Sequence, residues 1–170
     1  MEKVARIASY VLDRYRRRFG EELDEIKLQK LLYFIQREAI IRKGKPMFEA
    51  EFRAWKSGPV ILEIHERYKA GDLQEELSEE SESEWKECLD YVFEELAPKS
   101  AMSLVSLAHG ERSWKRARKG FTKYDRSDVP MELSDIYEDA AYRKQRRESL
   151  PIRRALHAFY QLHPEIQPHL

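Results

Sequence analysis

Residues 27–34, KLQKLLYF, lie at the centre of the pattern that decides the fold. Apolar positions recur there at the three- and four-residue spacing of one face of an α-helix. They are Leu28, Leu31, Leu32, Ile35 and Ala39. Asp24 suits the start of this helix and Gly44 its end, with Pro46 just beyond. The stretch therefore predicts a helix that lines the core.

The remaining residues of this stretch fall on the sides of the same helix. The helical period places Lys27, Gln29 and Lys30 away from the leucine stripe, so we expect them on its exposed side. Tyr33 and Phe34 extend the apolar surface sideways. The stretch is first of all a packing device.

A second helical pattern precedes it. Apolar residues between Val4 and Tyr15 recur at helical spacing, and Gly20 is placed to end that helix. Because few residues separate the two helices, we expect them to form an early hairpin.

Residues 47–55 show a two-residue period instead. Phe48, Ala50, Phe52 and Ala54 alternate there with mostly polar residues, which is typical of a strand. The following Ser57-Gly58-Pro59 predicts a turn, with Pro59 as the first residue of a helix that ends at Gly71. A strand needs a partner, and we expect it near residues 129–131.

The segment 72–95 is strongly acidic and holds a single basic residue, Lys86. Its first half predicts a solvated linker. Ser81 and Glu84 then form a capping-box pattern before a helix whose apolar stripe begins at Trp85 and includes Cys88. Pro98 lies where that helix should stop.

Shorter helices follow. Ser100 is expected to cap a helix that reaches Gly110, and Ser113 to cap another from Trp114 to Gly120. The polar residues 121–128 predict a loop.

The C-terminal part predicts two more helices. One runs from about residue 133 towards Arg147, and the other follows Pro151 and ends at Pro164. The second is expected to bury Ile152, Ala155, Leu156, Phe159 and Tyr160. The fold class is therefore mainly α: a single compact helical domain of about seven to eight helices, with one short β element, a strand around 47–55.

Composition excludes several classes of protein. The 170 residues hold 31 Lys and Arg against 31 Asp and Glu, so the chain is not a globally basic nucleic-acid binder. One cysteine, Cys88, cannot form an internal disulfide, and no apolar run is long enough for a membrane span. We expect a cytoplasmic protein that does not bind a membrane.

The sequence offers no convincing catalytic or metal-binding pattern. The five histidines are scattered, and phosphate-binding glycine loops and helical metal motifs are absent. His109 and Glu111 could form an acid–base pair, but a histidine in the last turn of a helix is sufficiently explained by the helix dipole. Cys88 lies on an apolar stripe and is expected to be a buried packing residue. We expect no enzyme activity, no cofactor and no metal.

Basic residues cluster in three places. Two readings remain open: a surface that follows phosphates, or solvated faces paired with the chain's own acidic segment. The clusters are Arg14 and Arg16 to Arg18; Arg112, Lys115, Arg116, Arg118, Lys119, Lys123 and Arg126; and Arg143, Lys144, Arg146, Arg147, Arg153 and Arg154.

Several unlike motifs occur in an order that resembles the Panacea, or SocA-like, antitoxin domain. After the helix motif at 27–34 come Gly44 and Pro46 before Met47-Phe48, then Ala54-Trp55, then Gly58-Pro59-Val60. A helix, a histidine and a tryptophan follow. The motif residues are Lys27, Leu28, Lys30, Leu31, Tyr33, Phe34, Gly44, Pro46, Gly58, Pro59 and His109. The resemblance implies a domain over residues 1–142, with residues 143–170 as a helical extension that packs on it or projects from it.

The resemblance also implies a function. Such domains, found in bacteria and their phages, lack catalytic activity and neutralise a protein toxin encoded by an adjacent gene, by direct binding. Alternatively, some deliver the toxin to a cytoplasmic protease. A nucleic-acid-binding regulator that uses the basic clusters is a further, unlikely alternative.

Aromatic and arginine side chains dominate the energetics of protein interfaces, and four such residues are candidates for partner binding. Trp55 either packs in the core or anchors an interface. Trp114, between polar neighbours, is the better candidate for an exposed tryptophan. Arg116 and Tyr124 complete the set.

Overall fold

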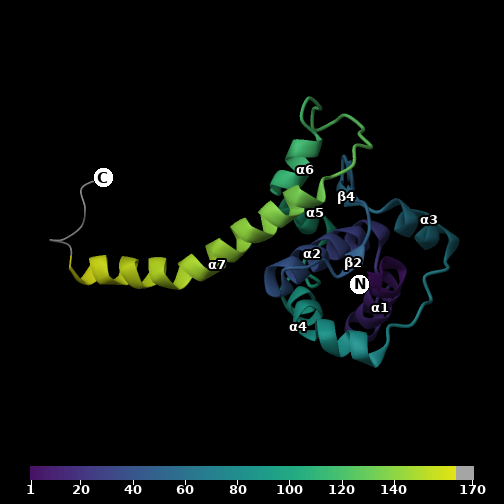
Figure 1. The fold of residues 1–170 in the computed structure, drawn as a ribbon, viewed down its shortest axis with the longest axis horizontal. Helices are drawn as coiled ribbons and strands as arrows, with labels where there is room; N and C mark the ends of the chain where they lie inside the picture. Colours follow the sequence, from purple (N-terminus) through teal and green to yellow (C-terminus); the bar gives the residue numbers. More distant parts are fainter. Residues whose placement is uncertain (164–170) are drawn as a thin grey trace.

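The computed structural model describes residues 1–163 and confirms a single, mainly helical domain (Figure 1). The elements follow in this order: β1 Glu2–Lys3, α1 Val4–Phe19, α2 Glu25–Lys43, β2 Phe48–Glu49, β3 Arg53–Trp55, β4 Gly58–Val60, α3 Leu62–Ala70, α4 Glu79–Glu95, α5 Ala101–His109, α6 Arg112–Ala117 and α7 Leu133–Leu162. None of the described helices is both long enough and apolar enough to cross a membrane.

Helix α2 is the central element. Helices α1, α3, α4, α5 and α7 all pack against it, so it is buried on nearly every side. Asp24 accepts a hydrogen bond from the Lys27 backbone N–H at its start, and Gly44 ends it in the left-handed conformation, as predicted. The expected exposed side does not exist: Lys27, Gln29 and Lys30 are all buried. The spacing of the leucines correctly predicts one buried face of α2, but it does not indicate that the opposite face is buried as well.

The predicted strand over 47–55 is two strands. β2 pairs in parallel with β1, whereas β3 and β4 form an antiparallel hairpin. Gly58 and Pro59 therefore lie in β4, and α3 begins only at Leu62. The predicted partner near residues 129–131 is confirmed, since the Ala54 N–H donates to the Val129 carbonyl at 2.8 Å and the Met131 N–H donates to the Phe52 carbonyl at 2.7 Å.

Two helix starts differ from the prediction. Helix α4 is capped by Ser78, three residues before the expected Ser81, whose backbone N–H donates to the Ser78 hydroxyl. Helix α6 begins at Arg112, so Ser113 is a buried residue within it and not its cap. Ser100 does cap α5, as predicted.

The cap of α6 comes from a distant part of the chain. Asp139 on α7 accepts the backbone N–H groups of Arg112 and Ser113, at 2.8 and 3.0 Å, and also the Tyr33 hydroxyl at 3.1 Å. One buried carboxylate thus joins α2, α6 and α7. Local sequence contains no sign of such a cap.

The two predicted C-terminal helices are a single helix. Helix α7 runs through Pro151 without ending, and its second half extends away from the rounded body (Figure 1). Ile152, Ala155, Leu156 and Phe159, expected to be buried, are exposed. The predicted stop at Pro164 lies outside the described residues.

Replacing Asp139 tests the connection that its carboxylate makes among α2, α6 and α7. Asp139→Ala should lower the free energy of unfolding by about 2–4 kcal/mol, because two helix N–H groups and a buried hydroxyl lose their acceptor. Glu138→Ala is the control: its partner Arg116 is exposed, so the change should be within about 1 kcal/mol. Urea unfolding measures both. Equal effects of the two substitutions would show that Asp139 does not support the fold.

Candidate partner-binding surface

The polar side chains of α2 hold the β3–β4 hairpin from inside. The Gln29 side-chain amide donates to the Ile61 carbonyl at 3.1 Å and accepts the Ile61 N–H at 2.9 Å. The Lys30 ammonium donates to the Pro59 carbonyl at 2.8 Å. These bonds, which we call the Gln29–Lys30 clamp, satisfy backbone groups that would otherwise be buried without partners.

Two further polar side chains of α2 join it to neighbouring elements. Gln36 accepts the Met47 N–H at 2.9 Å and donates to the Phe48 carbonyl at 2.7 Å, which fixes β2. The Lys27 ammonium donates to the Tyr15 hydroxyl at 2.9 Å and so joins α2 to α1. Helical spacing alone could not reveal these roles, because each partner lies in another element.

Lys30 and Gly58 fit closely together. Burial lowers the pKa of the Lys30 ammonium from 10.5 to about 7, an effect that the charge of Glu25 partly opposes. Gly58 has a positive φ of 104°, and a Cβ atom there would lie 2.6 Å from Lys30 Cε. Because the lysine is enclosed, only glycine leaves it room.

Next to this clamp lies a groove of about 980 Å³, which we call the Trp55 groove. It is bordered by the start of α2, the β3–β4 turn, the first turn of α3, helix α5 and the loop between α6 and α7. Its lining residues are Ile26, Trp55, Lys56, Ser57, Leu62, Ala101, Met102, Val105, His109, Lys123, Tyr124, Arg126, Ser127 and Asp128.

Trp55 lies in the wall of this groove. Its indole N–H donates to an Asp128 carboxylate oxygen at 2.9 Å, and its ring meets the edge of His65 with centroids 5.0 Å apart. The side chain is half-buried. Trp55 is therefore fixed in orientation while part of it faces the groove.

Trp114 is not exposed, contrary to expectation. Its residue is only 8% exposed, and its indole N–H donates to the Trp55 carbonyl at 2.9 Å. The ring stacks on His109 with centroids 4.1 Å apart. Of the polar neighbours that suggested exposure, Lys115 and Arg116 are exposed, but Ser113 is buried like the tryptophan. Trp114 supports the groove from behind.

His109 and Glu111 do not form the acid–base pair considered from sequence. His109 Nε2 lies 2.9 Å from the Lys56 carbonyl, and burial lowers the pKa of its imidazole, an effect opposed by that hydrogen bond. Glu111 instead pairs with Arg37. The two side chains serve separate structural contacts.

The other two candidates differ in their surroundings. Tyr124 is 70% exposed and lines the groove, with the ammonium groups of Lys56 and Lys123 near its ring. Arg116 does not line the groove; it pairs with Asp135 and Glu138 on α7. The structure thus brings Trp55 and Tyr124 together and places Arg116 elsewhere.

Sequence reasoning missed two groove residues. Ile26 and Met102 are 48% and 70% exposed. Each lies off the buried stripe of its helix, and an apolar residue out of phase with the stripe was the signal that could have found them. Together with Tyr124 they gather large exposed apolar side chains at one place.

The rim of the groove is positively charged. Lys56, Lys123 and Arg126 line it, and within residues 1–163 none of them has an ion-pair partner. Asp128 is engaged by the Trp55 indole. An apolar floor with free cations at its edge favours a partner segment that carries apolar side chains beside carboxylates.

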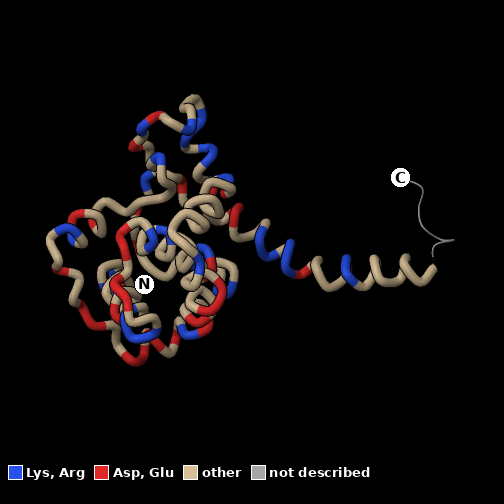
Figure 2. The backbone as a smooth tube through the Cα atoms, turned by 180° about the vertical axis from the view of Figure 1, so that it is seen from behind, with Lys and Arg blue, Asp and Glu red and all other residues tan. Residues whose placement is uncertain are grey.

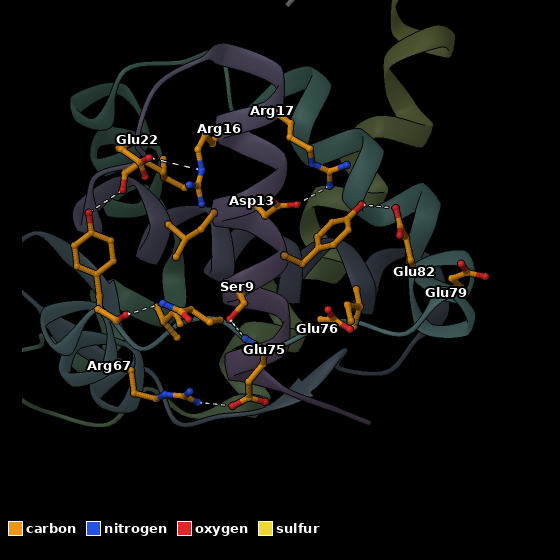
Figure 3. A pocket seen from close by; sticks show the side chains of 18 residues that line it. Ser9, Asp13, Arg16, Arg17, Glu22, Arg67, Glu75, Glu76, Glu79 and Glu82 are labelled. Atoms are coloured by element: carbon orange, nitrogen blue, oxygen red, sulfur yellow. Dashed lines mark hydrogen bonds and ion pairs between the residues drawn. The ribbon is translucent and has the colours of Figure 1, made fainter.

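A second cavity, of about 810 Å³, lies between α1 and residues 71–82 and is polar (Figure 3). Its charges largely pair with each other. Arg17 lies 2.9 Å from Asp13, Arg67 lies 2.6 Å from Glu75, and the Tyr10 hydroxyl donates to Glu82 at 2.8 Å. This cavity therefore offers a ligand little unneutralised charge.

Basic residues at the end of α1 are paired as well. Arg14 contacts Asp90 at 2.7 Å, and Arg16 lies 3.6 Å from Glu22. These arginines therefore fit the interpretation of solvated faces paired with acidic groups of the same chain. They fit a phosphate-binding surface less well.

Metal binding and thiol chemistry are the remaining possibilities for the described residues. No group of three His, Cys, Asp or Glu side chains among the described residues could hold a metal ion. Cys88 is buried as predicted, and burial raises the pKa of its thiol to about 11, so the reactive thiolate is disfavoured.

The groove and the clamp lie largely within a segment shared with known proteins. Residues 28–115 match the family described as "Antitoxin SocA-like, Panacea domain". Antitoxin SocA of Caulobacter vibrioides (strain NA1000 / CB15N) is 38% identical over 48 residues, which are 28% of this chain and 26% of that relative. The match thus covers about a quarter of the relative's length. No solved structure matches the chain significantly.

Gly58→Ala tests the fit between the clamp and the hairpin. We expect a loss of more than about 2 kcal/mol in the free energy of unfolding, because a strained φ adds to a clash with enclosed Lys30. Gly120→Ala is the control, with a φ of 92° but no atom within 4 Å of the added Cβ, and should cost about 1 kcal/mol. Equal losses in thermal or urea unfolding would mean that Lys30 moves aside freely.

The pKa of Lys30 predicts a pH dependence. Between about pH 7 and pH 10.5 the unfolded chain holds a proton on Lys30 that the folded chain has released, so stability rises with pH. Below about pH 7 both states are protonated and the full cost of burying the charge remains. Lys30→Met should remove a slope of up to about 1.4 kcal/mol per pH unit, measured by urea unfolding at several pH values.

Exposed Lys56 is the matched control for that experiment, since Lys56→Met should leave the slope as it is in the parent protein. A slope retained in Lys30→Met would show that another group is responsible.

Proposed function

The chain belongs to the SocA-like Panacea family of antitoxins, and we propose on that basis that it neutralises a protein toxin by binding it directly through the Trp55 groove. The observation that carries this proposal is the gathering of exposed apolar side chains at the groove. Met102 and Tyr124, both 70% exposed, lie there beside a fixed tryptophan. Exposed apolar patches of this kind mark interaction sites.

The wall of the groove is suited to binding because it is already ordered. Trp55 is held by Asp128, and the hairpin that carries it is held by the Gln29–Lys30 clamp. A binding surface whose side chains are fixed beforehand loses less entropy on association. Tyr124, on the outer loop, is the adaptable part of the site.

The charge at the rim defines the chemistry of the partner. Lys56, Lys123 and Arg126 favour a toxin segment with carboxylates around one or more apolar side chains. The toxin is encoded by an adjacent gene, and the complex forms in the cytoplasm. The protein acts without catalysis, by covering the toxin's active surface.

Coexpression with the product of the adjacent gene tests the proposal. Direct binding predicts that the chain restores growth and copurifies with that product. Restored growth accompanied by loss of the product would favour delivery to a protease. A harmless neighbour that does not copurify would contradict the antitoxin role.

Two substitutions test the groove itself. Met102→Ala with Tyr124→Ala should weaken binding at least about tenfold, because interface anchors of this kind contribute 1 kcal/mol or more each, as an order of magnitude. Leu133→Ala with Tyr137→Ala, both partly exposed outside the groove, are the matched control and should leave affinity within about twofold. Titration calorimetry measures both pairs. Unchanged affinity in the groove variant would place the toxin elsewhere.

A further inference from the structure

Helix α7 consists of two parts with different surroundings. Residues 133–147 pack against α2 and α6, whereas residues 148–162, which we call the arm, extend into solvent (Figure 1). Figure 1 shows that α7 changes direction along its length, and the helix contains Pro151, which cannot donate a backbone hydrogen bond. The family match ends at residue 115, so the whole of α7 lies outside it.

Ion pairs fix the packed part of α7 to the body. Arg147 reaches the buried Glu38 carboxylate at 3.0 Å and donates to the Tyr91 hydroxyl at 2.7 Å. Arg143 lies 3.5 Å from buried Glu111. Because both carboxylates are buried, breaking these pairs is costly. The arm therefore leaves the body in a defined direction.

The arm carries an apolar stripe in which Ile152, Leu156 and Leu162 are exposed. Ile152 and Leu162 are 70% and 78% exposed, and Leu156 is 48% exposed. Their spacing places them on one face of the helix, where Phe159 also lies. Such a row of anchors is how an amphipathic helix binds a hydrophobic groove.

Positive charge flanks this stripe. Arg153 lies at the edge of the stripe, Arg154 lies towards the opposite face, and Glu148 is the only acidic residue of the arm. Figure 2 shows Lys and Arg positions on the part of α7 that projects from the body. Neither arginine has an ion-pair partner among the described residues, in contrast to those of α1.

The arm does not suit pairing with a second copy of the chain. A stripe of eleven residues on two facing helices buries less than the roughly 1,200 Å² that stable interfaces need. The basic charge of the two arms would also repel. A partner with the opposite charge fits better.

We propose that the arm is a second toxin-binding element, whose Ile152–Leu162 stripe enters an apolar groove of the toxin with carboxylates on its rim. This inference rests on the proposed function and adds a contact separate from the Trp55 groove. The anchored part of α7 presents the arm as a formed helix, so little ordering is required on binding.

The experiment compares two variants of the arm in binding to the purified product of the adjacent gene. Ile152→Glu with Leu156→Glu places two carboxylates in the stripe. His157→Glu with Gln161→Glu adds the same charge at the same i, i+4 spacing on the opposite face and is the matched control. All four positions are exposed, so both variants should fold, which circular dichroism checks.

The stripe variant should bind at least about tenfold more weakly by calorimetry, and the control should stay within about threefold of the parent chain. Arg153→Ser with Arg154→Ser should reduce the salt dependence of binding.

If the stripe variant binds as tightly as the parent chain, the arm is not a toxin-binding element, and the proposed function is unaffected. Absence of binding by the parent chain would overturn both. A dimer in light scattering that the stripe variant loses would assign the stripe to a second copy and so overturn the toxin as its occupant.

Discussion

The fold depends on hydrogen bonds that α2 makes from within the core. A helix buried on all sides must find a partner for every polar side chain it carries, because an unpaired buried group is costly. Lys30 meets this demand at Pro59 of β4, Gln29 at Ile61 just after that strand, and Gln36 at Phe48 of β2. These short strands have few neighbours of their own. The helix thus supplies the partners that a larger sheet would have supplied.

The same bonds explain why the Trp55 groove lies where it does. The hairpin is pinned to α2 at Pro59 and Ile61, so the turn that carries Trp55 is held firmly beside α5. Trp114 and His109 then fill the space behind that turn. Side chains on the far side of the turn remain uncovered. The core therefore extends up to the hairpin. Because the hairpin packs on that core, the wall of the groove that carries Trp55 is rigid.

Sequence patterns predicted the elements better than the contacts between them. Apolar periodicity located most helices, and the strand partner near residues 129–131 was also found, because these features depend on local spacing. The burial of Lys30 and the capping of α6 by Asp139 were missed, because both depend on residues distant in the sequence. For the candidate site, aromatic character identified Trp55 and Tyr124. Polar neighbours were misleading for Trp114, because Lys115 and Arg116 are exposed whereas Ser113 and the tryptophan are buried.

Charge pairing differs between the surfaces of this chain that pack internally and the surfaces proposed to bind a partner. The net charge is +0, yet the charges are not neutralised evenly. Carboxylates of the same chain pair with Arg14, Arg16 and Arg17 of α1 and with Arg143 and Arg147 of α7, so these arginines contribute little attraction for a partner. The cations at the Trp55 groove and on the arm lack such partners within residues 1–163. Unneutralised charge beside exposed apolar side chains speeds encounter with an acidic protein and opposes basic ones. Under the proposed function, the unpaired cations of the groove and the arm therefore favour an acidic partner over a basic one.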